Sequence, residues 1–337
     1  MHLPLFNLRR LPVTRSPTDP FLGPLHALLP LYGLDGRAVP VRHTVSENTT
    51  YKVLDGDGYA AMVLRVHRAG YHTADEIRSE LTWVEALDDA GVVETARPVR
   101  RLDGSLLSEI DAGGVSHFVS AFRFLEGEEP KVGSHLADRF QDLGAITARL
   151  HAHARDWRRP ESFRRKRWDF DAMFGPNALW GDWRAAVLDD AGRAVLERLQ
   201  VTLKRRLADY GDGPERFGLI HGDLRLANLL DDGARLAVID FDDCGFGWFA
   251  YDFAAAISFY EDDPAIPDLQ AAWLDGYRTV APFDDEAEAV LPTMIMARRL
   301  LLTAWLASRA GNDTDAEHGD GFAEGTVGLA ERYLAAS

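Results

Sequence analysis

Two short segments in the second half of the chain carry the residues that could do chemistry. Residues 219–228 contain His-Gly-Asp and end on Asn228, five positions after Asp223, and residues 237–241 place Asp240 after an apolar run. Phosphoryl transfer needs a carboxylate to accept the proton of the attacking hydroxyl. It also needs a second carboxylate and an amide oxygen to hold Mg²⁺ across the phosphates. An aspartate, an asparagine and a second aspartate in this order supply those groups.

Each of these side chains also has a purely structural use, because aspartate and asparagine cap helices and turns. One of them alone would favour that interpretation. All three occur in order, with the short apolar runs at residues 229–230 and 236–239 between them. The complete set therefore favours a phosphotransferase site over unrelated caps.

The pattern His-Gly-Asp-x-x-x-x-Asn at residues 221–228 resembles the aminoglycoside phosphotransferase/choline kinase superfamily, relatives of the protein kinases. Glycine stands in this pattern where protein kinases have arginine. Residues 239–243 and 296–300 are most similar to the bacterial stress-response kinase branch, the RdoA-like proteins. The resemblance covers roughly residues 40–310 and is most specific at residues 219–252.

The resemblance implies a role for single residues of the catalytic half. It implies that Asp223 is the catalytic base and that Asn228 and Asp240 bind the metal, with ATP and Mg²⁺ as cofactors. It also implies that Asp252 braces the catalytic loop and that His221 supports the loop structurally.

Cationic side chains are expected to meet the phosphates. Arg225, two residues after Asp223, stands where protein kinases often keep a lysine that faces the γ-phosphate. Arg65 stands where the superfamily usually has a lysine for the α- and β-phosphates; arginine neutralises the same oxygens with a different reach. We expect Arg65 to pair with Glu80, fifteen residues on, with Glu76 or an exposed surface pair as the alternatives.

Two further segments would contact the nucleotide. Residues 46–50 are the expected phosphate-covering loop, in which hydroxyls and backbone N–H groups must act because the loop has no glycine. The backbone of residues 123–125 is the expected hinge to the adenine. The residues assigned to the nucleotide in these segments are Ser46, Asn48, Thr49, Arg123 and Leu125.

The chain is predicted to have an α+β, bilobal, protein-kinase-like fold. An N-terminal nucleotide-binding lobe at residues 1–125 has an antiparallel sheet and one major helix, and a mostly helical lobe at 126–337 holds the catalytic loop and the acceptor site. Thr73 and Glu76 form an expected capping box at the start of the major helix. The expected strands are 38–45, 50–54, 59–66, 96–100 and 115–124, with the pair 229–230 and 236–239; the expected helices are 73–90, 133–155, 182–209, 250–260, 267–278 and 285–309.

The composition excludes several function classes. A formal net charge of −16 repels phosphates, so no nucleic-acid partner is expected. The most apolar stretch, residues 289–307, has Arg298 and Arg299 at its centre, which indicates a core helix rather than a membrane span. The first residues lack the apolar core of a signal peptide, and the single Cys244 permits no intrachain disulfide. We therefore expect a cytoplasmic protein.

The phosphate acceptor is expected to be a small molecule. Only twelve positions separate Asp240 from Asp252, which leaves no room for the activation segment of a regulated protein kinase. Transfer to a small hydroxyl compound is therefore favoured. The acidity of the chain would suit a compound that carries an amine, but solubility alone is the favoured explanation of this acidity. Two alternatives stay open: a Ser/Thr protein kinase of the stress-response type, and a non-catalytic nucleotide-binding scaffold.

Overall fold

The computed structural model describes residues 19–45, 48–131, 133, 136–309, 319 and 321–336. The chain divides into two compact units. The main change of unit falls after Glu126. The first unit comprises Met1–Ala86, Thr95–Glu126 and Ser162–Arg164; the second comprises Leu87–Glu94, Gly127–Glu161 and Arg165–Ser337.

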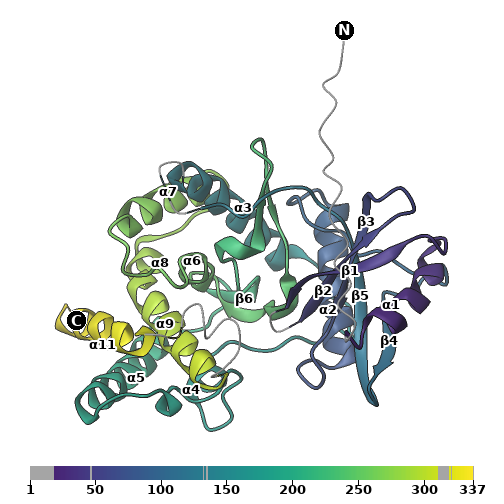
Figure 1. The fold of residues 1–337 in the computed structure, drawn as a ribbon. Helices are drawn as coiled ribbons and strands as arrows, with labels where there is room; N and C mark the ends of the chain where they lie inside the picture. The colour runs from purple at the N-terminus through teal and green to yellow at the C-terminus, as the bar shows by residue number, and fades with distance from the viewer. Residues whose placement is uncertain are drawn as a thin grey trace. The chain divides into compact units, whose positions relative to one another are not determined.

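An antiparallel sheet of five strands forms the centre of the first unit (Figure 1), with the order β1-β2-β3-β5-β4. The β2–β3 hairpin turns at Asp55, whose carboxylate accepts hydrogen bonds from the N–H groups of Asp57 and Tyr59, both at 2.9 Å. This is the turn that the Asp-Gly-Asp-Gly sequence predicts. The strands are β1 (Val39–Val45), β2 (Thr49–Leu54), β3 (Ala60–Val66), β4 (Leu107–Ala112) and β5 (Val115–Arg123).

Alternation along β3 assigns its side chains to the two faces of this sheet. Leu64 belongs to the core cluster that includes residues of α1 (Leu22–Leu28). Val63 packs instead with residues of α2 (Ala74–Asp89). Because successive side chains of a strand point to opposite faces, Arg65 lies on the same face as Val63, toward α2.

Helix α2 begins at the capping box that the sequence predicts. Thr73 Oγ1 accepts a hydrogen bond from the N–H of Glu76 at 3.2 Å, and Glu76 Oε2 accepts one from the N–H of Thr73 at 2.8 Å. These bonds satisfy N–H groups that the first helical turn leaves without partners. The helix therefore starts where residues 73–90 were expected to form one.

Two predictions for this unit differ from the structure. Residues 96–100 form no strand: Pro98 makes a single bridge with Phe122, because proline has no N–H with which to continue a ladder. Strand β4 and helix α1 are not predicted by the sequence pattern. Half of the β4 residues are polar, and α1 contains a Gly-Pro pair that is typical of turns.

Helices make up most of the second unit (Figure 1). Helices α3 and α7 approach closely at glycines: a Cβ on Gly144 would lie 1.9 Å from the carbonyl oxygen of Trp273, and one on Gly276 would lie 1.8 Å from that of Gln141. The helices of this unit are α3 (Leu136–Asp156), α4 (Phe170–Phe174), α5 (Asp190–Tyr210), α6 (Tyr251–Ala256), α7 (Ile266–Arg278), α8 (Asp285–Ala289), α9 (Leu291–Ala307) and α11 (Phe322–Ala335).

These helices differ from the sequence prediction mainly at their ends. Helix α5 begins at Asp190 rather than at 182, because the Asp189 side chain caps it by accepting from the N–H of Gly192 at 2.7 Å. The expected helix at 285–309 is divided into α8 and α9 at Val290. Helix α11 contains two glycines, which lower its helix propensity, and the sequence pattern does not predict it.

The apolar stretch of the second unit is a core element. Among the described residues, Asp285–Ala307 is long and apolar enough to cross a membrane by composition, but 78% of its apolar window is buried inside the protein. Arg298 and Arg299, at its centre, are both buried as well. The structure therefore agrees with the core helix expected from these two charges.

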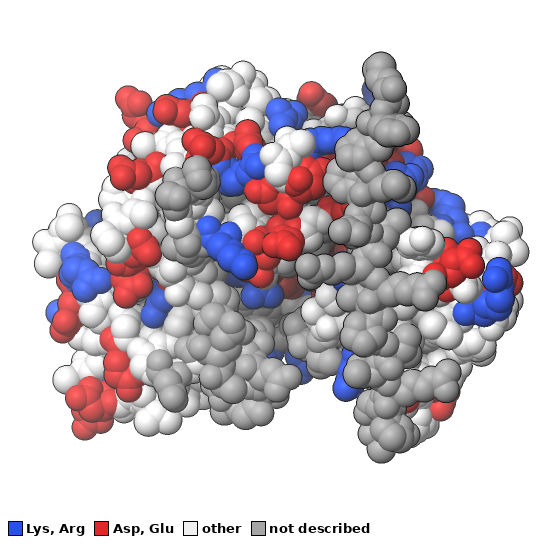
Figure 2. Space-filling model, turned by 45° about the horizontal axis from the view of Figure 1, so that its top comes forward, with Lys and Arg blue, Asp and Glu red and all other residues white. Residues whose placement is uncertain are grey.

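Charged side chains of both signs are interspersed on the face shown in Figure 2. Exposed pairs such as Arg278 and Glu288, 2.6 Å apart, join cations to the more numerous carboxylates. A surface of mixed charge with a net value of −16 favours solubility.

Candidate active site

Two small antiparallel sheets in the second unit carry the candidate catalytic segments. Strand β6 (Phe217–Ile220) pairs with β9 (Gly245–Trp248), and β7 (Leu229–Asp231) pairs with β8 (Leu236–Val238). The second pair is predicted by the sequence, and the first is not. Residues 221–228 connect β6 to β7, so the expected catalytic loop lies between two strands that are each held by a partner.

The β7–β8 hairpin brings the segments of the two proposed metal ligands together. Asn228 directly precedes β7, and Asp240 lies two residues after the end of β8. Leu229 pairs with Val238, and the N–H of Ile239 donates a hydrogen bond to the carbonyl oxygen of Asn228 at 2.9 Å. The register of this hairpin therefore places Asn228 beside the residue that precedes Asp240.

Asp240 has an unusual backbone conformation, with φ 60° and ψ 68°. A residue other than glycine in this left-handed region costs about 1–3 kcal/mol, and such residues cluster at functional sites. The segment that follows is held by Arg165, which is buried and donates to the carbonyl oxygens of Cys244, at 2.6 Å, and of Asp242. The position of Asp240 is therefore fixed from both sides.

The donor set at this hairpin fits Mg²⁺. A carboxylate oxygen from Asp240 and an amide oxygen from Asn228 are hard ligands of the kind that Mg²⁺ prefers. Among the described residues, no group of three His, Cys, Asp or Glu side chains is placed to hold a metal ion. A Mg²⁺ ion in a nucleotide site needs no such group, because phosphates and water complete its coordination.

Asp252 holds the start of the catalytic loop with both carboxylate oxygens. Oδ1 accepts from the N–H of Gly222 at 2.8 Å, and Oδ2 accepts from the N–H of His221 at 3.2 Å. Gly222 has a φ of 80°, and a Cβ there would lie 2.8 Å from the carbonyl oxygen of Asp243, so only glycine fits this turn. These are the contacts expected of a bracing aspartate, whose effect on activity stays a prediction.

His151, on α3, extends this brace, and nothing in the sequence pattern identifies it. Its Nε2 lies 3.0 Å from Asp252 Oδ2 and its Nδ1 lies 3.0 Å from the Tyr277 hydroxyl. Because a carboxylate only accepts hydrogen bonds, Nε2 carries the proton and Nδ1 accepts from Tyr277. Burial lowers the pKa of His151, against the opposing effect of the Asp252 carboxylate, and so favours this neutral form.

His221 links the catalytic loop to the segment that carries Asp240. Its Nε2 lies 3.1 Å from the carbonyl oxygen of Ile239, and its Nδ1 accepts from the N–H of Asp223 at 3.2 Å. Both ring nitrogens are thus occupied by backbone groups. This arrangement supports a structural role for His221 rather than proton transfer.

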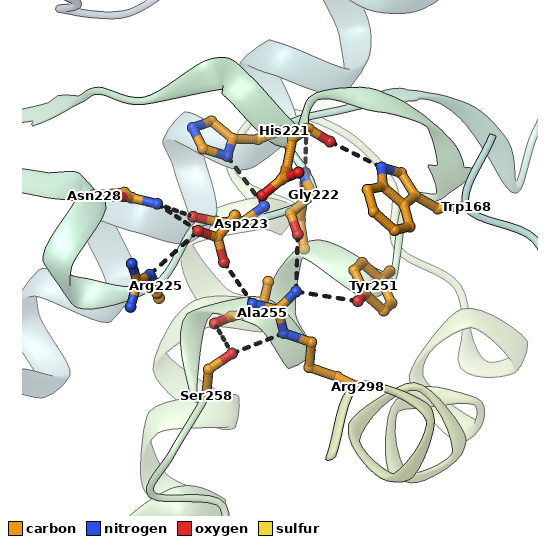
Figure 3. A network of polar contacts seen from close by, with 12 residues as sticks. Trp168, His221, Gly222, Asp223, Arg225, Asn228, Tyr251, Ala255, Ser258 and Arg298 are labelled. Atoms are coloured by element: carbon orange, nitrogen blue, oxygen red, sulfur yellow. Dashed lines mark hydrogen bonds and ion pairs between the residues drawn. The ribbon is translucent and has the colours of Figure 1, made fainter. Parts of the chain in front are cut away.

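The Asp223 carboxylate lies among hydrogen-bond donors (Figure 3). Asn228 Nδ2 donates to Oδ2 at 2.7 Å, Arg225 Nε donates to Oδ2 at 3.2 Å, and Arg298 Nη2 donates to Oδ1 at 2.5 Å. Burial by itself raises the pKa of Asp223, but the cations of Arg225 and Arg298 hold it below its usual value. The carboxylate is therefore ionised at neutral pH, as a base must be.

Of the two arginines that contact Asp223, Arg225 was predicted to belong to the active site and Arg298 was not. Arg225 was expected near the γ-phosphate, and the structure gives it Asp223 as a partner; the phosphate contact stays a prediction. Arg298 was expected only in the core helix at residues 289–307 and in the segment 296–300 that resembles the stress-response kinase branch, with no role in the active site. Its burial there was nevertheless a signal, because a charge inside an apolar helix requires a partner.

The first unit contains the ion pair that the sequence predicts between Arg65 and Glu80. Arg65 Nη1 lies 2.7 Å from Glu80 Oε1, and the two side chains are 8% and 0% exposed. The guanidinium also lies over the Phe122 ring, 4.7 Å from its centroid. Arg65 and Glu80 thus form an internal pair rather than a surface pair, while Glu76 caps its helix. Contact of Arg65 with phosphate stays a prediction.

The expected phosphate-covering loop is shorter than residues 46–50. Ser46 lies outside the described residues. Thr49 is not in a loop, because it begins β2 and pairs with β1 and β3. Asn48 is buried, and its Oδ1 accepts from the N–H of Arg68 at 3.1 Å. That bond gives Asn48 a structural role, and its contact with the nucleotide stays a prediction.

The expected hinge follows the last strand of the first sheet. Arg123 ends β5, pairs with Met62, and donates its N–H to the carbonyl oxygen of Arg97 at 2.8 Å. Leu125, two residues on, is half-buried. Contact of this backbone with adenine stays a prediction.

Comparisons with known proteins agree with this arrangement. The family described as "Phosphotransferase enzyme family" matches residues 40–283. The structure of a microcompartment-associated aminopropanol kinase is 41% identical and has a TM-score of 0.85, over 93% of this chain and 97% of that one. Amicoumacin kinase of Bacillus subtilis (strain 168) is 23% identical over 269 residues, 76% of each chain. The structure of amicoumacin kinase hAmiN with AMP-PNP, Ca²⁺ and Ami is 21% identical, with a TM-score of 0.70 over 86% of this chain and 87% of that one, which shows a shared fold.

Proposed function

The chain belongs to the phosphotransferase enzyme family, and from this premise we propose that it transfers the γ-phosphoryl group of ATP, with Mg²⁺, to the hydroxyl of a small amino alcohol. It is a kinase of small molecules, like its relatives. The observation that carries the proposal is the Asp223 carboxylate, which is ionised and lies beside Asn228 at the base of the hairpin that carries Asp240. We also propose a cytoplasmic location, where ATP is available, and cell fractionation tests it.

In the proposed reaction, Asp223 orients the acceptor hydroxyl and takes its proton. The acceptor oxygen forms a bond to the γ-phosphorus, the bond from that phosphorus to the bridging oxygen breaks, and ADP leaves with the electron pair. Asn228 and Asp240 would hold Mg²⁺, which when bound would supply charge neutralisation at the phosphates. Asp223 then returns its proton to solvent, so atoms and charge balance.

The amine on the acceptor is supported by two observations. The 41% identity to an aminopropanol kinase extends over almost the whole of both chains. The net charge of −16 favours encounter with a cationic substrate over an anionic one.

An acceptor panel tests this proposal. The assay uses γ-labelled ATP and Mg²⁺. Aminopropanol and ethanolamine are expected to be phosphorylated with a kcat/KM at least about 100-fold above that of propanol. Propanol has no ammonium group, and leaving the groups that bind the ammonium without a partner costs about 3 kcal/mol. The same assay with GTP determines the nucleotide preference. Label that appears only on protein would instead identify a protein kinase, and equal use of propanol would remove the amine from the proposal.

Arg65 provides a test on the nucleotide side. Arg65→Met is expected to raise the Kd for ATP about 10- to 100-fold, because a charged hydrogen bond to phosphate contributes about 1.5–3 kcal/mol. Isothermal titration calorimetry measures this. Arg65→Lys, which keeps the charge beside Glu80, serves as the matched control and should retain most of the affinity. Unchanged ATP affinity in Arg65→Met would remove this residue from the nucleotide site.

A further inference from the structure

Arg298 is a charged residue buried in the middle of α9, with an exposed fraction of 1%. Every nitrogen of its guanidinium has a partner (Figure 3). Nε donates to Ser258 Oγ at 3.0 Å, Nη1 to the Tyr251 hydroxyl at 3.2 Å and the carbonyl oxygen of Gly222 at 3.3 Å, and Nη2 to Asp223 Oδ1 at 2.5 Å. One side chain therefore binds both the carboxylate of Asp223 and the backbone just before it.

The two carboxylate oxygens of Asp223 accept different numbers of hydrogen bonds. A carboxylate offers about four lone-pair positions, two on each oxygen. Asn228 and Arg225 occupy both positions on Oδ2. Among the described residues, Arg298 is the donor to Oδ1, so one position on that oxygen is left for an acceptor hydroxyl. The direction of that position is set by the Arg298 contact.

The neighbouring Arg299 is also buried but has different partners from Arg298. On α9 it pairs with Glu261 at 2.6 Å and donates to Thr326 Oγ1 at 2.9 Å, away from the catalytic loop. Successive residues of a helix point about 100° apart, so the two arginines serve different partners. Buried ion pairs add little net stability on average, so fold stability does not by itself explain why a charge at Arg298 meets Asp223.

We propose that Arg298 is a positioning residue of the phosphoryl transfer: it clamps Oδ1 of Asp223 to Gly222 and the α6 region, and so aims the remaining lone pair at the acceptor hydroxyl. This inference rests on the proposed role of Asp223 as the base. Helix α9, which is far along the chain from the catalytic loop, would thus affect turnover through the contact of Arg298 with Asp223.

A double-mutant cycle tests the proposal. Arg298→Gln is expected to lower kcat about 100-fold, the cost of misplacing a reacting group by about 1 Å, with the KM for ATP changed less than about twofold. In an Asp223→Asn background the same substitution is expected to change kcat less than about threefold, because the group it positions is already lost. Arg298→Lys, which keeps the charge, should have a kcat about tenfold above that of Arg298→Gln.

Arg299→Gln is the matched control, since it also leaves a buried carboxylate without its arginine. All activities are divided by the fraction of protein that binds ATP in calorimetry, which separates turnover from folding. Arg299→Gln is expected to keep the kcat of the unmodified enzyme. If Arg298→Gln does not fold, Arg298→Lys carries the test, with an expected kcat about tenfold below the unmodified enzyme and an unchanged KM for ATP.

Each other result has a defined meaning. Full kcat in Arg298→Gln, or in Arg298→Lys where only that variant folds, would overturn the inference. The inference would also be overturned if Arg298→Gln lowered kcat equally in the unmodified and Asp223→Asn backgrounds, or if Arg299→Gln lowered kcat as much. Either result would mean that Arg298 supports the general fold. Full activity in Asp223→Asn alone would instead overturn the proposed base, and with it the proposed function.

Discussion

Replacement of Asp223 by asparagine is expected to lower kcat by about 10²–10⁴-fold and to leave ATP binding nearly unchanged. The amide keeps the shape of the side chain but cannot take the proton of the acceptor hydroxyl, and general-base catalysis contributes factors of this size. The measurement pairs steady-state kinetics with aminopropanol and calorimetric titration of ATP.

Glu261→Gln is the matched control for this experiment. Glu261 pairs with Arg299 on α9 at 2.6 Å, as Asp223 pairs with Arg298, and its side chain is fully buried. Both substitutions leave a buried arginine without its carboxylate, which is expected to cost up to about 3–5 kcal/mol of stability. Only Asp223→Asn should lower kcat per folded molecule. Comparable losses in both variants would mean that Asp223 acts through stability and not as the base.

Replacement of Asp240 by asparagine is expected to abolish measurable turnover at ordinary Mg²⁺ concentrations, a loss of about 10³-fold or more. The substitution removes the negatively charged carboxylate that would hold the metal and offset part of its charge. Asparagine tolerates the left-handed backbone seen at Asp240 better than alanine does, so the amide tests the charge with little added strain. Titration of kcat against Mg²⁺ and Mn²⁺ measures the effect.

Asp231→Asn is the corresponding control for the hairpin. Asp231 ends β7, and its carboxylate pairs with Arg139 at 2.6 Å. Its substitution alters a carboxylate on the same hairpin and is expected to preserve the metal dependence. If Asp240→Asn keeps the metal dependence of the unmodified enzyme, the metal ligand has been placed on the wrong residue.

Local features of this protein could be predicted from the sequence. The spacing of Asp223, Asn228 and Asp240 identified the phosphotransferase family because these residues lie within one loop and one hairpin. The capping box of α2 followed from a three-residue spacing. The pair Arg65–Glu80 was predictable because one strand and the next helix carry it.

Several elements could not be predicted, because local composition and propensity were misleading there. Residues 96–100 have a strand-like composition, but Pro98 limits them to one bridge. Strand β4 is short and has polar side chains, and its pairing with β5 stabilises it more than its own propensity does. Helix α11 contains two glycines and is nonetheless helical, since packing overrides propensity.

The sequence by itself determined the family, the class of reaction and the groups that would perform it. The family resemblance implied that Asp252 and His221 support the catalytic loop, but only the tertiary structure identified the more distant side chains that hold these groups in place. His151 reaches Asp252 across 101 positions and Arg298 reaches Asp223 across 75, and neither separation leaves a periodic signal. A catalytic loop can be recognised from neighbours in sequence, whereas the partners of a buried charge are chosen by whichever helices the fold packs against it.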